Sequence, residues 1–240
     1  MKRFVQCGAG AVLMAAALTV ASPSAASTML ATFEGYASGV DQSNFFGLGT
    51  SFTDARFVAQ FTYDTALGQS ETNDHYDARF GGPGFGGGVS PILGASLTLN
   101  NVRDSFDVGQ DGSANVFNQN GWAQTFFYSN FFGSLGSAST WNYLQLFVLD
   151  APSPILLTTP YTGTDQPVNS PPLEGEVAYH SVFVDGAQTV NYSLTLSPTS
   201  VTLSAIPEPS TWMLLLTGFF GLGLLLRRAR RYDLSLSAAQ

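Results

Sequence analysis

The sequence predicts an all-β protein, a two-sheet antiparallel sandwich of jelly-roll-like form, flanked by an N-terminal signal helix and a C-terminal transmembrane helix. Phe, Tyr and Gly are frequent, and long helical stretches rich in Ala, Glu and Lys are missing from the middle of the chain. Eight or more short segments alternate or accumulate apolar residues, and turn-forming residues separate them. Many short strands at such a spacing are typical of a sandwich.

The expected strands differ in how clearly they alternate. Every second residue is apolar or aromatic in Phe57–Tyr63 and in Thr189–Leu196, so each segment is expected to bury one face. Leu97 and Leu99 alternate with polar neighbours in the same way. Trp141–Leu149 is apolar at nearly every position, which predicts a central strand covered on both faces. Further strands are expected at Leu30–Tyr36, Trp122–Ser129, Val177–Asp185 and Val201–Ala205.

Asp-Gly and Asn-Gly pairs mark the expected turns. Asp185-Gly186 lies between two alternating segments and predicts the clearest hairpin of the chain. Asp111-Gly112 and Asn120-Gly121 predict further turns. The glycine-rich Gly81–Gly88 lacks the lysine and hydroxyl of a phosphate-binding loop, and Ala151–Pro172, rich in proline, predicts an extended crossover.

The N-terminus has the three parts of a secretory signal peptide. Lys2 and Arg3 form a short positive region, Phe4–Val20 is apolar, and Ser24-Ala25-Ala26 offers a cleavage site of small residues. We therefore predict a signal peptide over residues 1–26, which signal peptidase removes, and one exported domain over residues 27–205.

This exported domain is strongly acidic. It keeps three basic residues, Arg56, Arg79 and Arg103, against fifteen acidic ones, which gives a net charge of about −12. Nucleic-acid binding needs a cationic surface and is therefore excluded, and docking on anionic lipid headgroups is disfavoured for the same reason. The domain contains no cysteine, so its stability must come from burial rather than from disulfides.

The C-terminus combines three features in a fixed order. Pro207-Glu208-Pro209 is expected to be extended, because proline fixes φ and has no N–H to donate. The uncharged run Trp212–Leu226 would rise about 22 Å as a helix, which approaches the thickness of a bilayer core. Four arginines follow this run and would stay in the cytoplasm: Arg227, Arg228, Arg230 and Arg231.

This tail resembles the PEP-CTERM sorting signal of bacterial exported proteins over residues 206–231. Ile206 replaces the usual Val of the motif, and the short cytoplasmic tail Tyr232–Gln240 extends beyond the arginines, where such signals usually stop. The resemblance implies recognition by an exosortase, transient anchoring in the inner membrane and delivery to the cell surface or the extracellular space. It also implies an association with exopolysaccharide or biofilm.

Few residues point to catalysis. His75 and His180 are the only histidines; His75 lies in a polar loop, and His180 is expected on the exposed face of a strand. The chain has no Gly-x-Ser-x-Gly elbow, and no pair of carboxylates is distinguished from the others. We therefore expect a protein without catalytic residues that is not an enzyme.

Two sets of residues are candidates for binding. Asp104, Asp107 and Asp111 bring three carboxylates close together in the sequence, which suits Ca²⁺ in an extracellular protein, with a solvated acidic turn as the alternative. A glycan-binding platform could use exposed aromatic residues, for which core packing is the alternative. The candidates are Trp122, Phe131, Phe132, Trp141 and Tyr143.

Together these observations predict an exported, surface-sorted protein with a structural role in an extracellular polysaccharide matrix. The alternative is a module that binds glycans, with or without a requirement for calcium, or a carbohydrate-active module.

Overall fold

The computed structural model describes residues 28–119, 122–135, 138–150, 156–164, 177–206 and 216–221. The predicted signal peptide, the Pro-Glu-Pro triplet, the four arginines and the tail after them lie outside these residues. The described part of the domain consists of twelve strands and one short 3₁₀ helix, η1 (Pro83–Phe85). The strands are β1 (Thr28–Asp41), β2 (Ser51–Asp64), β3 (Gln69–Asn73), β4 (Tyr76–Gly81), β5 (Ile92–Leu99), β6 (Val102–Phe106), β7 (Asp111–Gln119), β8 (Trp122–Leu135), β9 (Ala138–Asp150), β10 (Tyr161–Thr164), β11 (Val177–Val184) and β12 (Ala187–Ala205).

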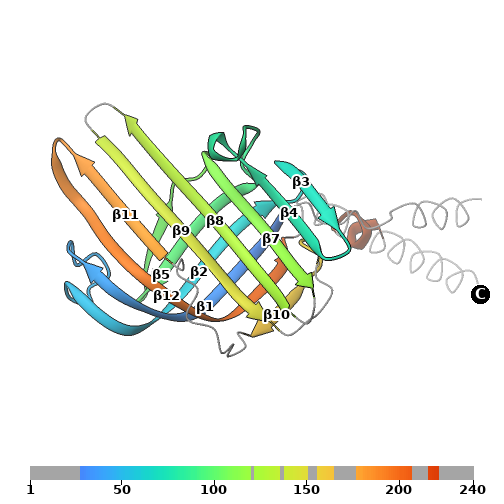
Figure 1. The fold of residues 1–240 in the computed structure, drawn as a ribbon, viewed down its shortest axis with the longest axis horizontal. Coiled ribbons are helices and arrows are strands. Elements are labelled where there is room, and N and C mark those ends of the chain that lie inside the picture. The colour runs from blue at the N-terminus through green and yellow to red at the C-terminus, as the bar shows by residue number, and fades with distance from the viewer. Residues whose placement is uncertain are drawn as a thin grey trace, which may run out of the picture.

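The strands form one hydrogen-bonded sheet in the order β3-β4-β7-β8-β9-β11-β12-β1-β2-β5-β6, with β10 also paired to β12. Every pairing is antiparallel. The all-β, antiparallel prediction is therefore confirmed. The separate two-sheet sandwich is not what the strand order shows, because a single sheet curls over itself (Figure 1).

Strand β12 makes the curl. Its first part pairs with β11, from Ala187 to Thr195, and its later part pairs with β1, from Tyr192 to Ala205. The sheet thus has a front half (β4, β7, β8, β9 and β11) and a back half (β1, β2, β5 and β6), whose strands cross in Figure 1. The inner surfaces of the two halves face each other and enclose the core, while their outer surfaces point away from each other.

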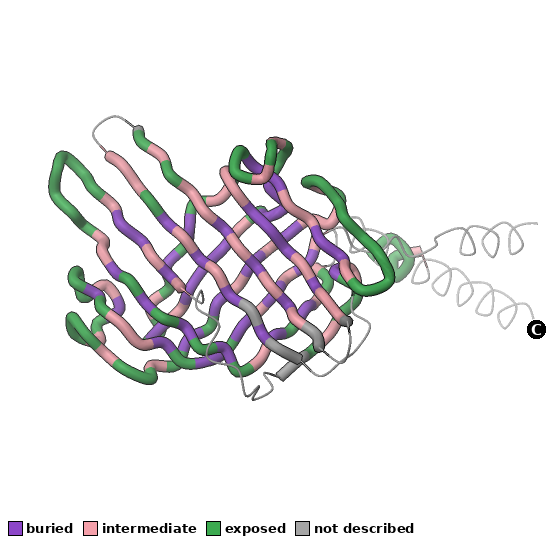
Figure 2. Tube along the Cα trace, viewed as in Figure 1, coloured by how far each residue is buried: buried purple, intermediate pink, exposed green. Residues whose placement is uncertain are grey.

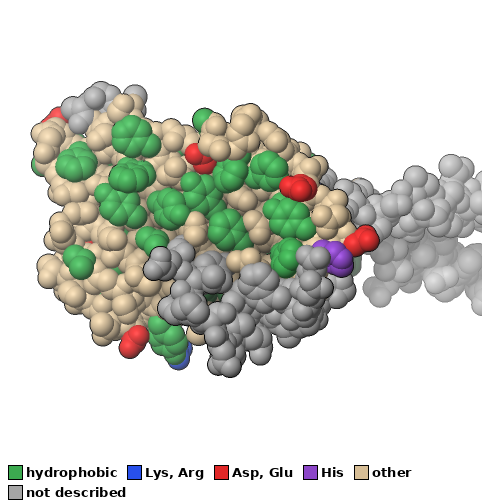
Figure 3. Space-filling model, in the orientation of Figure 1, with side chains coloured by type: hydrophobic (Ala, Val, Ile, Leu, Met, Phe, Trp, Pro, Cys, Tyr) green, Lys and Arg blue, Asp and Glu red, His purple; other side chains and the backbone are tan. Residues whose placement is uncertain are grey.

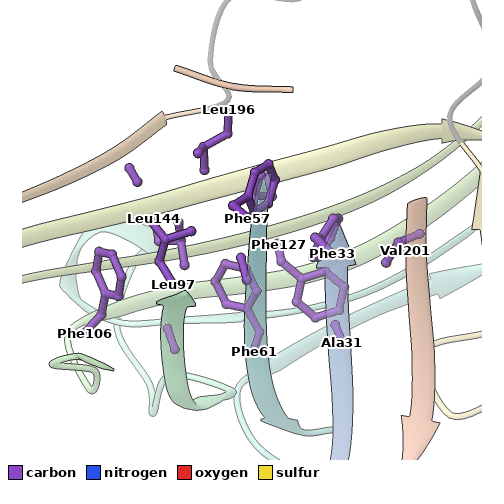
Figure 4. Close-up of a cluster of buried hydrophobic side chains, with 14 of the residues drawn as sticks. Ala31, Phe33, Phe57, Phe61, Leu97, Phe106, Phe127, Leu144, Leu196 and Val201 are labelled. Atoms are coloured by element: carbon purple, nitrogen blue, oxygen red, sulfur yellow. The ribbon is translucent and has the colours of Figure 1, made fainter. Parts of the chain in front are cut away.

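Phe127 of β8 links the two halves inside the core. Its ring centroid lies 5.8 Å from that of Phe33 on β1, and 5.5 Å and 5.0 Å from those of Phe61 and Tyr63 on β2 (Figure 4). All four side chains are fully buried. Because aromatic side chains bury large apolar areas, this cluster is expected to dominate the contact between the halves.

Alternation along the strands positions this core, as Figure 2 shows. Phe57–Tyr63 buries Phe57, Ala59, Phe61 and Tyr63, as predicted, and Tyr192, Leu194 and Leu196 of β12 are likewise buried. The prediction for Trp141–Leu149 is wrong on one point for the side chains that the structure describes: the strand is central, but its outer face is not fully covered. Leu144, Leu146 and Val148 are buried, whereas Trp141, on the other face, is 49% exposed.

The predicted turns have mixed outcomes. Asp185 and Gly186 form the hairpin turn between β11 and β12, and both have the positive φ angles, 51° and 79°, that such a turn requires. Asp111-Gly112, by contrast, begins strand β7 and is not a turn. A Cβ on Gly112 would lie 2.1 Å from the Ser90 hydroxyl, so this glycine serves close packing. Asn120-Gly121 lies outside the described residues.

Within the described residues, no helix is both long and apolar enough to cross a bilayer. The described helical part of the predicted C-terminal helix is residues 216–221.

Candidate functional site

Hydrophobic side chains are spread over the outer surface of the front half (Figure 3), and many of them are aromatic. Strand alternation places them there, because the neighbouring positions on the same strands point into the core. We call this set the aromatic face. It consists of Tyr76 and Phe80 on β4, Phe85 in η1, Phe117 on β7, Phe126, Tyr128 and Phe132 on β8, Trp141 and Tyr143 on β9, and Tyr179 and Phe183 on β11.

The rings of the aromatic face contact one another in a connected row. Phe85 lies 5.9 Å from Phe80 and 5.8 Å from Tyr128, and Tyr128 lies 5.3 Å from Tyr143 between ring centroids. A second group pairs Trp141 with Tyr179 at 4.9 Å. Edge-to-face contacts of this kind restrain the rings and leave part of each face open to a ligand.

Exposure is greatest where β8 and β9 extend beyond β7. Phe132 is 61% exposed and is the direct cross-strand neighbour of Trp141, which is 49% exposed. The side chain of Gln110 holds the backbone of Phe132 from the β7 side: Phe132 N–H donates to Oε1 at 2.8 Å, and Nε2 donates to the Phe132 carbonyl. One amide side chain thus pairs with the backbone of β8 beyond the end of β7, and holds the residue that carries the most exposed ring of this face.

The aromatic face is uncharged where its strands are central. The described outward positions of β8, β9 and β11 carry aromatic, amide, hydroxyl or aliphatic side chains and no Asp, Glu, Lys or Arg. A phenol of ordinary pKa, about 10, is protonated at neutral pH, and burial raises the pKa of both Tyr128 and Tyr143 further, so both hydroxyls can donate hydrogen bonds. The Tyr143 hydroxyl donates to Gln145 Oε1 at 2.5 Å.

Three of the five predicted platform residues lie on this face: Phe132, Trp141 and Tyr143. Phe131 points to the opposite side of β8 and is half-buried, and the side chain of Trp122 lies outside the described part. The sequence did not indicate Tyr128, Tyr179 or Phe183. Their alternation with inward residues is the signal that could have found them.

A second polar cluster lies inside the domain and corrects the prediction for His180. His180 is buried, not exposed, because it shares the inner face of β11 with Ala178. Its Nδ1 lies 2.6 Å from Asp104 Oδ2, and its Nε2 lies 3.3 Å from the Thr140 hydroxyl. The Tyr192 hydroxyl donates to the same carboxylate oxygen at 2.6 Å. Burial, followed by the charge of Asp104, holds the pKa of Tyr192 well above its usual value.

The three predicted calcium ligands are not brought together. Asp104 is occupied by His180 and Tyr192 inside the domain, whereas Asp111 Oδ1 accepts a hydrogen bond from Gly84 N–H at 2.8 Å. The backbone of Asp107 is held by the side-chain amide of Asn142, at 3.0 Å and 2.9 Å. Across the described residues, no three His, Cys, Asp or Glu side chains form a group that could hold a metal ion.

His75 lies in the exposed turn between β3 and β4. Its backbone N–H donates to Asn73 Oδ1 at 2.8 Å, a local hydrogen bond that stabilises the turn. This position agrees with the expected polar loop.

The first and last residues of the described domain lie side by side at one end of the paired central strands β1 and β12. Met29 of β1 is paired with Ala205 of β12, and Ile206 N–H donates to the Thr28 carbonyl at 3.0 Å. Ile206, the first residue of the predicted sorting signal, therefore lies beside Thr28, the second residue after the predicted signal peptide.

A protein-family model described as the PEP-CTERM protein-sorting motif matches residues 205–231. This confirms the resemblance of the tail to that sorting signal and is consistent with an exosortase substrate. The motif indicates export and exosortase-mediated sorting to the cell surface. No curated protein and no solved structure matches the chain.

Proposed function

We propose that this protein is a non-enzymatic structural component of an extracellular polysaccharide matrix, to which it binds through the aromatic face after sorting to the cell surface. Exosortase and signal peptidase are its processing enzymes, and the membrane holds it only before processing. The observation that carries this proposal is the combination of exposed aromatic rings and uncharged amide side chains on one continuous surface.

A saccharide ring suits this surface. Its C–H groups form apolar patches that pack on aromatic faces, while its hydroxyls exchange hydrogen bonds with amides and phenols. Trp141 and Phe132 offer the most exposed rings, and Gln145 and Tyr143 offer polar groups beside them. A neutral glycan would meet no charge on the described outward positions of β8, β9 and β11, so it would not have to desolvate one.

Glycoside hydrolysis, part of the alternative function, is less well supported. It requires two carboxyl groups on either side of the scissile bond. The described outward positions of β8, β9 and β11 provide none. Binding without turnover therefore fits this surface better.

A glycan array with the full-length protein in non-ionic detergent tests the proposal. We expect selective binding of neutral oligosaccharides, and Trp141→Ala and Phe132→Ala should each weaken it about tenfold, as is typical of an exposed aromatic contact residue. Leu93→Ala is the matched control, because Leu93 is 45% exposed but lies on the back half. Its binding should equal that of the wild type.

The same array, run with calcium and with a chelator, separates the alternatives. Binding that disappears with the chelator would favour the calcium-dependent module. Absence of binding to every glycan would overturn the proposal and leave a structural protein that does not bind saccharide by this face.

A further inference from the structure

A hollow of about 570 Å³ lies on the outer surface of the back half, which points away from the aromatic face. Glu34 and Tyr36 of β1, Arg56 and Val58 of β2, and Thr98 of β5 line it. Register places these side chains outward, since Tyr36 is paired with Arg56 and Glu34 with Val58, while the alternate residues Phe33, Phe57 and Phe61 are buried.

Two local features shape the hollow. The pairing of β1 with β12 shifts by one residue between Glu34 and Gly35, so that Thr199 of β12 bulges and lines one wall. On the other side, Asn100 and Asn101 form the turn between β5 and β6, with φ angles of 49° and 63°. The Asn100 amide donates to the Phe46 carbonyl at 3.0 Å and so fixes this wall.

Arg56 is the distinctive residue of this hollow. The exported domain has three basic residues, and Arg79 is engaged by Asp77 at 2.7 Å. Arg56, in contrast, has no carboxylate within ion-pairing distance in the described part of the chain, although many acidic residues are available. Its guanidinium lies over the ring of Tyr36, 6.0 Å from the centroid, which orients it at the surface of the hollow.

We propose that this hollow binds a carboxylate-bearing sugar, a uronate residue of an acidic polysaccharide. The guanidinium of Arg56 pairs with the uronate carboxylate, because its planar fork matches that group. Tyr36, which is 40% exposed, packs against the sugar ring. Glu34, Asn101 and Thr199 are positioned to bond the sugar hydroxyls.

The choice of a saccharide rests on the proposed function, whereas the choice of an acidic one rests on Arg56. A uronate site here and a neutral-glycan site on the aromatic face would occupy opposite outer surfaces of the same domain. One molecule could then hold two polysaccharide chains together, and a matrix would gain avidity from such bridges.

Isothermal titration calorimetry of the full-length protein in non-ionic detergent tests the site. The probes are trigalacturonate and its methyl ester, which has the same shape but no charge. We expect the acid to bind about tenfold more tightly than the ester, as a charge-assisted hydrogen bond would give. Arg56→Gln should remove this preference.

Arg103→Gln is the matched control. Arg103 is also an exposed arginine on the outer surface of the back half, opposite Thr98, but it does not line the hollow. Its replacement should change the affinity for trigalacturonate less than twofold. Equal binding of acid and ester by the wild type, or equal losses in both arginine variants, would overturn the inference.

Two more measurements show whether a negative result concerns the aromatic face or the uronate site. Trigalacturonate binding that persists in Trp141→Ala supports a site separate from the aromatic face, even if no neutral glycan binds there. Binding of a short poly-glutamate peptide as tightly as trigalacturonate would overturn the assignment of a saccharide and make the hollow a site for acidic peptides.

Discussion

Tyr63 and Tyr192 are two buried tyrosines whose phenols are expected to link the stability of the core to alkaline pH. The Tyr63 hydroxyl donates to the Leu157 carbonyl at 2.7 Å, and that of Tyr192 donates to Asp104. Burial raises the pKa of both phenols far above the usual value, and Asp77 and Asp104, respectively, raise it further. The unfolded chain therefore loses these protons at lower pH than the folded domain does.

This difference predicts alkaline destabilisation. The two groups contribute their full stability below about pH 10, the unfolded-state pKa, and lose it as the pH rises above that value towards the folded-state pKa. Each contributes a slope of about 1.4 kcal/mol per pH unit there. Urea unfolding between pH 8 and 12 measures it. Tyr192→Phe should cost about 2 kcal/mol at pH 8, because a hydrogen bond to a carboxylate is lost, and should reduce the alkaline slope.

Phe61→Leu is the control for this prediction, because it weakens the same core without removing a titratable group. Its free energy of unfolding should be lower at every pH and should have the wild-type slope. Identical slopes in the wild type and in Tyr192→Phe would contradict the prediction.

The burial of some residues could be predicted from the sequence, whereas that of others could not. Phe57, Phe61 and Leu97 were predictable because burial follows alternation within one segment. Asp104 was not, since the partners that justify its burial, His180 and Tyr192, lie 76 and 88 positions away. A carboxylate alone predicts a solvated turn; only tertiary pairing makes its burial tolerable.

Among the elements, β12 determines the shape of the domain. Its bulge at Thr199 lies between Pro198 and Ser200, which pair with Gly35 and Glu34 of β1. Proline has no N–H to donate to the ladder and is tolerated at a bulge. Gly35 accommodates the close approach of the two strands, because a Cβ there would lie 2.2 Å from the Ser197 carbonyl oxygen.

Gly35→Ala should therefore disturb the joint between the two halves. The contact is with backbone, which cannot move aside without breaking pairing, so we expect a loss of about 3 kcal/mol in the free energy of unfolding, at the upper end for single substitutions. Gly94→Ala is the control, since its Cβ would meet only the Thr62 side chain at 3.8 Å. Denaturant unfolding should show that it costs less than about 1 kcal/mol. Equal costs for both variants would show that the close approach at Gly35 is unimportant.

Strands and turns could be predicted from the local sequence pattern. The segments that pack against each strand or turn could not. The hairpin at Asp185-Gly186 needs only local turn chemistry. Asp111-Gly112 has the same composition, yet Gly112 is there because Ser90 and Ile92 pack against it, and these residues are distant in sequence. The aromatic face was only partly visible for a similar reason: whether Trp141 is covered depends on which segment, if any, lies over β9.

For the whole molecule, the curled sheet separates two outer surfaces and brings the first and last described residues of the domain together. The antiparallel pairing of β1 with β12 places Thr28 beside Ile206. A domain tethered through Ile206 before processing would keep its broad outer surfaces free. The sequence could not predict the curl, because one strand, β12, pairs with β11 and then with β1 along its length.

Sorting of the whole chain can be tested in its native host. Because the matched motif begins at Ala205, the last residue of β12, cleavage near Pro207-Glu208-Pro209 would release the domain intact. We expect the mature surface protein, measured by intact-mass spectrometry, to lack Trp212 onward.

Replacing all three residues of the triplet by Ala should leave a heavier protein in the membrane fraction. Ile206→Val, which restores the usual residue of the motif, should be processed like the wild type. Wild-type surface protein that still carries Arg227–Arg231 would show instead that the tail is a permanent anchor.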